Sequence, residues 1–325
     1  SEAMLYLSGK LKKLGRVDHR DSFLDNNSLE RARGITIFSK QAVMPLGEMT
    51  VTLLDTPGHV DFSAEAERSL QVLDYAVLVI SGTDGVQAHT ETLWKLLERY
   101  NVPVFIFVTK MDLPGCDRQA LMDGLRMRLS ERCVDFSADG DALFESAAMC
   151  SEEAMDEYIE TGSIGTERMR DMLRCREIFP CCFGSGLRTE GVAEFLDMLE
   201  LYARPWDYGG DFSARVYKIA RDAQGNRMTF MKVTGGALRV RSLMKYSDRD
   251  GNAFEEKISQ LRIYSGAKHD TAETVLPGQI CAALGLTGTY PGQGLGTAGD
   301  FAEPLLEPVM SYRVILPPQS DPAVM

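Results

Sequence analysis

The sequence predicts an α/β protein in which a mostly parallel sheet carries helices on both faces and is followed by a small antiparallel β-barrel. Continuous apolar segments alternate with amphipathic ones as far as residue 203, which is typical of buried parallel strands connected by helices. Polar motifs follow three of these apolar segments, as expected at the carboxyl ends of parallel strands. From Pro205 onward the pattern changes to short alternating runs separated by glycine-containing turns, which favours a barrel.

The elements of the parallel sheet are expected between residues 35 and 203. A strand should begin at 35–38, and further strands are predicted at 49–54, 75–80, 102–108 and 178–183. Helices are predicted at 63–73, 87–100 and 192–203, and residues 115–172 should be mostly helical. The chain begins within a helix that ends at Gly9, and the polar stretch 17–34 is predicted to be a mobile loop.

The second part of the chain predicts a barrel. Its expected strands are 214–219, 228–233, 238–240, 256–258, 261–264 and 280–284. The predicted domains are therefore an α/β domain at 1–205, a β-barrel domain at 206–305, and a linker with the start of a further domain at 306–325. In that last segment residues 312–316 are expected to form one more strand.

Composition limits the classes of protein to which the chain can belong. At 44% hydrophobic and 25% charged residues it has the composition of a globular protein rather than a disordered one. No apolar run approaches the roughly 20 residues that span a bilayer, and no signal peptide is visible, so we expect no membrane contact and a cytoplasmic location. Seven scattered cysteines without a CxxC pair favour reduced thiols over a metal cluster. The net charge of −12 argues against a generic nucleic-acid binder.

The segment Asp55–His59 follows an alternating apolar strand and offers the groups that a magnesium-bound phosphate requires. Asp55 can hold the cation through water, and Gly58 lets its N–H approach a phosphate that a side chain would block. His59 can orient a water, and the Thr36 hydroxyl can ligate Mg²⁺ when a γ-phosphate is present. Taken alone, Asp-x-Pro-Gly is also ordinary turn chemistry, and a lone Thr is ordinary strand composition.

Two further strand ends suit a guanine ring. The Asp112 carboxylate can accept hydrogen bonds from two donors on one edge of guanine, a pair that adenine lacks. The alkyl stem of Lys110 can lie across a base plane, and Ser185 to Leu187 can bring backbone N–H groups to the guanine oxygen. Taken alone, Thr109–Asp112 is equally a strand end with a solvated Lys and a helix-capping Asp.

These segments together resemble the ordered signature motifs of translational GTPases. The resemblance extends over the whole chain and rests on order and spacing as well as composition. The matching segments are Arg31–Ile37, Asp55–Phe62, Thr109–Asp112 and Ser185–Leu187. Within this group the chain is most similar to elongation factor G and to the tetracycline-resistance ribosomal protection proteins. Ser8–Asp18 and Arg262–Gly266 favour the second branch.

The resemblance implies a P-loop GTPase fold and a role for each matching residue. Thr36 would be the switch I magnesium ligand, Asp55 would hold magnesium through water, and Gly58 N–H would meet the γ-phosphate. His59 would orient the attacking water on the ribosome. The guanine would be recognised by residues at the two other strand ends, namely Thr109, Lys110, Asp112, Ser185, Gly186 and Leu187. The implied ligands are GTP or GDP with Mg²⁺, and the implied partner of an expected monomer is the ribosome, both rRNA and ribosomal proteins.

Three departures from the family pattern matter. The chain contains no Gly-x-x-x-x-Gly-Lys-Ser/Thr phosphate loop, and Ser1 falls where the helix after that loop should already be running. We therefore expect that the natural start of the domain is absent, that neighbouring strand edges are unpaired, and that this chain alone is inactive. Thr109 replaces the usual Asn, which should weaken guanine selectivity. Ala32 and Gly186 replace commoner residues, and we expect both to be tolerated.

Three functions remain open at this point. The leading hypothesis is a ribosome-dependent GTP-hydrolysing translation factor, most like a ribosomal protection protein. Within the same class the rival is a housekeeping translocase of the elongation factor G type. In another class the rival is a non-catalytic ribosome-binding module with a degenerate nucleotide site.

Overall fold

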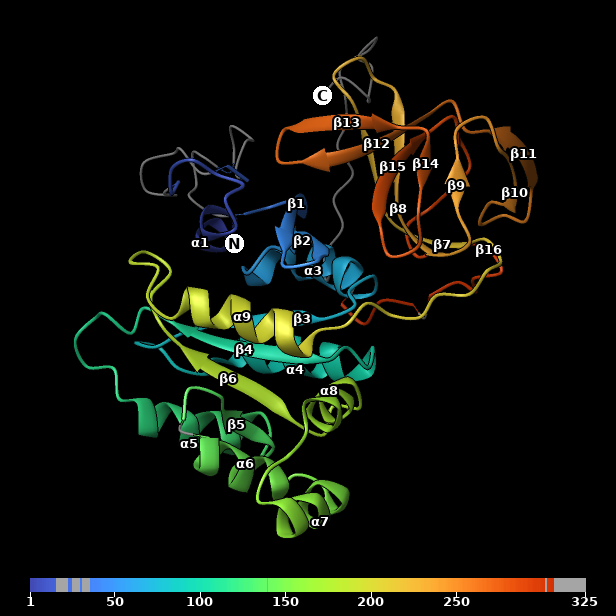
Figure 1. Cartoon of the computed structure of the whole chain (residues 1–325). Helices are drawn as coiled ribbons and strands as arrows, with labels where there is room; N and C mark the ends of the chain where they lie inside the picture. Colours follow the sequence, from blue (N-terminus) through green and yellow to red (C-terminus); the bar gives the residue numbers. More distant parts are fainter. Residues whose placement is uncertain (16–22, 25–29, 31–35, 139, 302, 307–325) are drawn as a thin grey trace. The chain divides into compact units, whose positions relative to one another are not determined.

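Two compact units make up the chain (Figure 1). The structure, a computed structural model, describes residues 1–15, 23–24, 30, 36–138, 140–301 and 303–306. The first unit comprises Ser1–Ser22, Met44–Val51 and Leu73–Pro205, and the second comprises Phe23–Val43, Thr52–Val72 and Trp206–Met325. The domain boundaries predicted from the sequence stay predictions. The expected strand at 312–316 lies outside the described residues.

The first unit is built on a four-stranded parallel sheet, which confirms the predicted α/β class. In spatial order its strands are β3 (Ala76–Ser81), β4 (Val104–Thr109), β6 (Phe179–Phe183) and β5 (Cys133–Asp135). β5 is only three residues long and lies in a segment that we predicted to be mostly helical, so that prediction missed it. Its central residue Val134 is 2% exposed and pairs with Pro180 of β6.

Helices cover both faces of this sheet. Phe105 and Phe107 of β4 contact Phe195 of α9, with ring centroids 6.4 and 5.1 Å apart, while Trp94 of α4 contacts Phe179 of β6 at 4.6 Å. Side chains alternate between the two faces of the sheet along each strand, and Ile106 pairs with Cys181, so Phe105 and Phe107 lie on the face opposite to that of Phe179. The helices α9 and α4, which contact these side chains, therefore lie on opposite faces. α5 and α6 lie beside β5, and α7 packs on α6 (Figure 1). The helices of this unit are α1 (Glu2–Leu7), α4 (Ala88–Arg99), α5 (Arg118–Arg128), α6 (Gly140–Ala148), α7 (Glu152–Thr161), α8 (Thr166–Arg174) and α9 (Val192–Tyr202).

A two-stranded hairpin, β1 (Lys40–Leu46) and β2 (Met49–Asp55), is shared between the units. The strand that we expected to begin at 35–38 begins instead at Lys40. The physical reason is that the N–H groups of Ile37 and Phe38 donate to the Glu30 carboxylate, so a side chain satisfies them in place of a neighbouring strand. Among the described strands, β2 pairs only with β1 and β3 only with β4, so each has an unpaired edge as expected.

The second unit contains the short helices after β2 and an antiparallel barrel. The helices are η2 (Val60–Phe62) and α3 (Ser63–Leu70). The main sheet has the order β13 (Lys268–Ala272), β12 (Gln260–Ser265), β15 (Ile280–Leu284), β8 (Arg227–Gly235), β7 (Ser213–Arg221) and β16 (Gly294–Gly296). Two small sheets pair β10 (Leu243–Ser247) with β11 (Ala253–Lys257) and β14 (Thr274–Val275) with β9 (Leu238–Arg239).

The barrel core is built from buried apolar side chains of the strands β7, β8 and β15. Val216 of β7, Met231 and Val233 of β8, and Cys281 of β15 are all fully buried and pack in one cluster. The ladders between the named barrel strands are all antiparallel, which confirms the predicted strand arrangement, and an isolated parallel bridge joins Gly209 to Gly235. The described helices include none that is long and apolar enough to cross a membrane.

Candidate functional site

Two strand-end loops meet at the carboxyl edge of the parallel sheet. β4 ends at Thr109 and the neighbouring β6 ends at Phe183, so the loops that follow them begin side by side. Met111 N–H donates to the Gly184 carbonyl at 3.0 Å, and Gly186 N–H donates to the Thr109 hydroxyl at 3.3 Å. The Thr that departs from the family pattern therefore fastens one loop to the other.

Asp112 is held ready to accept hydrogen bonds. The Ser185 hydroxyl is the strongest of the groups that lower the pKa of Asp112 below its ordinary value, and the Arg188 guanidinium acts in the same direction. Arg188 Nε lies 3.3 Å from Asp112 Oδ2, and the Asp112 side chain is 10% exposed. The carboxylate is thus ionised and oriented from one side. Sequence reasoning missed Arg188, because a single Arg in a turn belongs to no pattern.

Lys110 has an unusual backbone conformation. Its φ is +63°, in the left-handed region that non-glycine residues avoid at a cost of about 1–2 kcal/mol. The pKa of Asp84, in the loop after β3, is lowered by hydrogen bonds from Ser81 and Thr83 and by the positive charge of Lys110. Strain of this kind persists where the surroundings require it, which makes Lys110 a functional candidate on structural grounds as well.

The three N–H groups predicted to reach a guanine oxygen are not equivalent. Ser185 N–H donates to the Glu190 carbonyl at 2.9 Å, and Gly186 N–H donates to Thr109. The described hydrogen bonds include none from Leu187 N–H, and Leu187 is 55% exposed. Of the three groups, Leu187 N–H is the one left to meet a ligand, and its role stays a prediction.

The segment Asp55–His59 lies in the second unit. Asp55 ends β2, Pro57 is buried, and Gly58 and His59 are exposed. His59 caps η2: its Nδ1 accepts a hydrogen bond from Asp61 N–H at 3.3 Å and lies 3.5 Å from the Asp61 carboxylate. In the neutral ring the proton is then on Nε2, so Nε2 is the nitrogen that remains for a water.

The residues after Thr36 are anchored by a buried carboxylate that sequence reasoning missed. Glu30 is 1% exposed and accepts from Ile37 N–H at 3.0 Å and Phe38 N–H at 3.1 Å. It also forms an ion pair with Lys40. Burial alone would raise the pKa of Glu30, but Lys40 and the two N–H groups outweigh it and lower the pKa. Glu30 therefore fixes the chain directly after Thr36.

The predicted site residues divide between the two units. The structure brings the guanine residues Thr109, Lys110 and Asp112 together with Ser185 to Leu187 in the first unit. The second unit holds the predicted phosphate and magnesium residues, which are Thr36, Asp55, Gly58 and His59. Groups of three or more His, Cys, Asp or Glu with metal-site spacing do not occur among the described residues.

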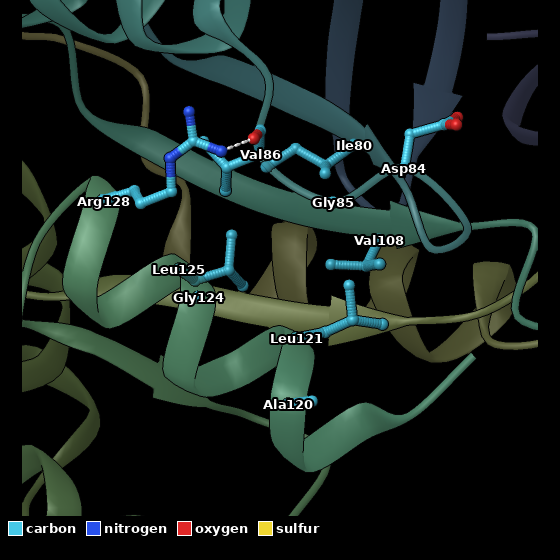
Figure 2. A pocket seen from close by; sticks show the side chains of 10 residues that line it. All are labelled: Ile80, Asp84, Gly85, Val86, Val108, Ala120, Leu121, Gly124, Leu125 and Arg128. Atoms are coloured by element: carbon cyan, nitrogen blue, oxygen red, sulfur yellow. Dashed lines mark hydrogen bonds between the residues drawn. The ribbon is translucent and has the colours of Figure 1, made fainter. Parts of the chain in front are cut away.

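A small cavity of about 200 Å³ lies under the loop after β3 (Figure 2). It is lined mainly by the apolar side chains of Ile80, Val108, Leu121 and Leu125, the last two from α5. At its edge Arg128 donates to the Val86 carbonyl, which ties α5 to the loop. The cavity contains none of the predicted site residues.

Comparison with known proteins identifies the family. The model of the elongation factor Tu GTP-binding domain matches residues 1–205. The chain belongs to this family. The predicted resemblance to translational GTPases is thereby confirmed, and the sheet edge that carries Thr109 and Asp112 is the edge of a GTP-binding domain.

Relatives of this GTP-binding family resemble the chain over most of its length. Elongation factor G of Ureaplasma urealyticum serovar 10 is 28% identical over 390 residues, covering 97% of this chain and 56% of the relative. Tetracycline resistance protein TetP of Clostridium perfringens is 29% identical over 343 residues, covering 96% of this chain and 52% of the relative. The chain thus spans about half the length of the curated relatives it matches.

A solved structure shares the fold. A crystal structure of a protein from Thermus thermophilus superposes with a TM-score of 0.78 and 22% identity, covering 93% of this chain and 52% of that one. This likeness confirms the predicted fold class, a P-loop GTPase-type sheet followed by a barrel.

Proposed function

We propose that the chain is the GTP-binding domain and barrel of a ribosome-dependent translation factor that binds GTP and hydrolyses it to GDP and phosphate. The observation that carries the proposal is Asp112, an ionised carboxylate oriented by Ser185 and Arg188 between two loops at the carboxyl edge of the sheet. A carboxylate so placed can accept two hydrogen bonds from guanine. The family match at 1–205 supports the same interpretation.

The remaining residues supply complementary chemistry. The stem of Lys110 covers the base, while Thr109 and Gly186 keep the two loops in register. Thr36 and Asp55 offer a hydroxyl and a carboxylate, which are the hard oxygen donors that suit Mg²⁺. Bound there, Mg²⁺ would neutralise charge on the phosphates. Gly58 presents an N–H to the γ-phosphate, and His59 Nε2 orients a water for in-line attack.

The proposed partners are the ribosome, through rRNA and ribosomal proteins, and guanine nucleotide, for a monomer that acts in the cytoplasm. Within the class we favour ribosomal protection over translocation, on the segments Ser8–Asp18 and Arg262–Gly266. The 325-residue sequence contains no Gly-x-x-x-x-Gly-Lys-Ser/Thr loop, so we expect weak binding of triphosphate by this chain alone.

The catalytic test uses the full-length protein that the gene encodes. His59→Ala should abolish ribosome-stimulated GTP hydrolysis and leave the affinity for a fluorescent GTP analogue unchanged. Unchanged turnover would remove His59 from its assigned role. A full-length protein that binds neither GTP nor GDP would instead support the non-catalytic ribosome-binding module.

A second assay separates the two ribosomal activities. The full-length protein with GTP should release labelled tetracycline from 70S ribosomes. Translocation would replace protection as the proposed activity if the protein with GTP released no more labelled tetracycline than a nucleotide-free control and also moved tRNA on the ribosome.

A further inference from the structure

Side chains of Glu30, of α3 and of β7 hold the backbone that follows Thr36. Glu30 accepts from the N–H groups of Ile37 and Phe38, as described above. Ser39 N–H then points at Glu65 Oε1 of α3, at 3.4 Å. Three consecutive N–H groups after Thr36 therefore donate to carboxylates rather than to a strand.

The carbonyl of Ser39 is held from the barrel. Lys218, on strand β7, donates from Nζ to Ser39 O at 3.0 Å, and the same Nζ lies 3.4 Å from Glu65 Oε1. Ser39 Oγ lies 2.5 Å from Ser69 Oγ, also on α3. Ser39 is thus fixed by β7 and α3 at once, and all of these residues belong to the second unit.

Lys218 is a largely buried lysine on the barrel strand β7. Its side chain is only 16% exposed, and its ammonium lies 5.4 Å from the centre of the Phe38 ring and 5.9 Å from that of Phe230. Burial lowers the pKa of Lys218, while Glu65 opposes that shift. Burying an ammonium costs free energy unless it is paired, and the pairing here is with the segment after Thr36 and with α3.

We infer that Lys218 is a positioning residue for Thr36, holding the following backbone so that the Thr36 hydroxyl stays where it can ligate magnesium. Ser39 follows Thr36 by three positions, a span of at most about 10 Å of extended chain. Freeing Ser39 would leave the backbone after Thr36 held by Glu30 alone. This inference rests on the proposed function, in which Thr36 acts only when a γ-phosphate is present, so the effect should be selective for GTP over GDP.

The test is Lys218→Met in the full-length protein, a change that keeps the volume of the stem and removes the charge. GTP affinity should fall about tenfold, the factor that one charged hydrogen bond supplies, with GDP affinity unchanged. The Mg²⁺ concentration for half-maximal GTP binding should rise in parallel. Amide hydrogen exchange at Ile37 to Ser39 should quicken in the nucleotide-free protein. The matched control is Lys245→Met, which removes an ammonium that is 74% exposed and lies 3.3 Å from Glu255.

A second pair of variants keeps the inference falsifiable if Lys218→Met folds poorly. Glu65→Gln keeps an acceptor and removes the charge that pairs with Lys218, and it should weaken GTP binding in the same direction. In a Thr36→Ala background neither change should weaken GTP binding further. If Thr36→Ala weakens GTP binding and Lys218→Met does not, the positioning role is wrong and the proposed function stands. If the unaltered full-length protein shows no binding of GTP, the proposed function itself fails.

Discussion

Replacing Asp112 with Asn should convert a guanine site into one that prefers xanthine. Guanine presents two donors on the edge that faces residue 112, and a carboxylate accepts from both. The amide of Asn accepts at one atom and donates at the other. Xanthine presents one donor and one acceptor on that edge, so it matches Asn as guanine matches Asp.

The structure sets the size of this effect. The Ser185 hydroxyl and Arg188 already orient the Asp112 side chain, so the new amide would be held in nearly the same place. One charged hydrogen bond is lost and a donor faces a donor, a mismatch of the kind that sites built for hydrogen bonding reject by about 10⁴-fold. Because a neutral amide pairs more weakly with Arg188 than the carboxylate does, we expect a somewhat smaller change of about 10³-fold in the ratio of GDP to XDP affinity.

The assay is competition of GDP and XDP against a fluorescent guanine nucleotide on the full-length protein. A matched control is Asp117→Asn, which alters a carboxylate that caps α5 through Gln119 N–H and Ala120 N–H. It should leave the GDP to XDP ratio unchanged. If Asp112→Asn lowered the affinities for GDP and XDP equally, the assignment of Asp112 to base recognition would be refuted.

Two further predictions concern the backbone and pH. Lys110→Gly removes a side chain from a backbone with φ of +63°, so the free energy of unfolding should stay the same or rise by up to about 1 kcal/mol while nucleotide affinity falls. The control Arg241→Gly, at φ +68°, should relieve the same strain and leave nucleotide affinity unchanged. Urea denaturation measures the stability of each variant, and nucleotide titration measures its affinity. Asp222 has its pKa lowered from 3.8 to about 2, chiefly by Asn226 and with help from Arg262, so its contribution to stability is full above about pH 4 and is lost as pH falls through about 2. Asp222→Asn should therefore be destabilised most at neutral pH and approach the unaltered protein near pH 2. Asp248 lies in a turn with the same Asn and N–H contacts, so Asp248→Asn should also lower the free energy of unfolding more at neutral pH than at low pH. A difference in stability between Asp222→Asn and the unaltered protein that grew toward low pH would contradict the lowered pKa of Asp222.

The sequence predicted the strands β4 and β6 well because they are buried on both faces, whereas the predicted strand at 49–54 pairs with β1 in a separate hairpin and not in the parallel sheet. A run such as Val104–Val108 is apolar throughout, and only a covered strand tolerates that composition. The missed strands lack this signal. β13 is polar and almost wholly exposed, and β16 is Gly-Leu-Gly, so neither alternates, and both are recognisable only from the neighbours that they pair with.

The candidate site was predictable to the extent that its residues stand next to one another in the chain. The motif residues Asp55, His59 and Asp112 were found in this way. Glu30 and Lys218 were not, because their significance depends on contacts across space: Lys218 meets Ser39 although 179 positions separate them in the chain. A carboxylate in a polar stretch of sequence and a lysine in a barrel strand carry no local sign of such contacts.

The partners of α3 bear on how proteins of this kind can be recombined. Glu67 of α3 is fully buried and accepts from Leu305 N–H and Leu306 N–H, both at 2.8 Å. The carbonyl of Val72, just past α3, accepts from Lys232 of the barrel, and the Val72 side chain packs with Tyr217 and Ile280. A polypeptide that ended at residue 205 would keep every predicted nucleotide residue. In it the Glu67 carboxylate and the Val72 carbonyl and side chain would lose the partners described here. A chimera that exchanges barrels between two relatives would therefore have to carry the side chains of α3 along with the barrel.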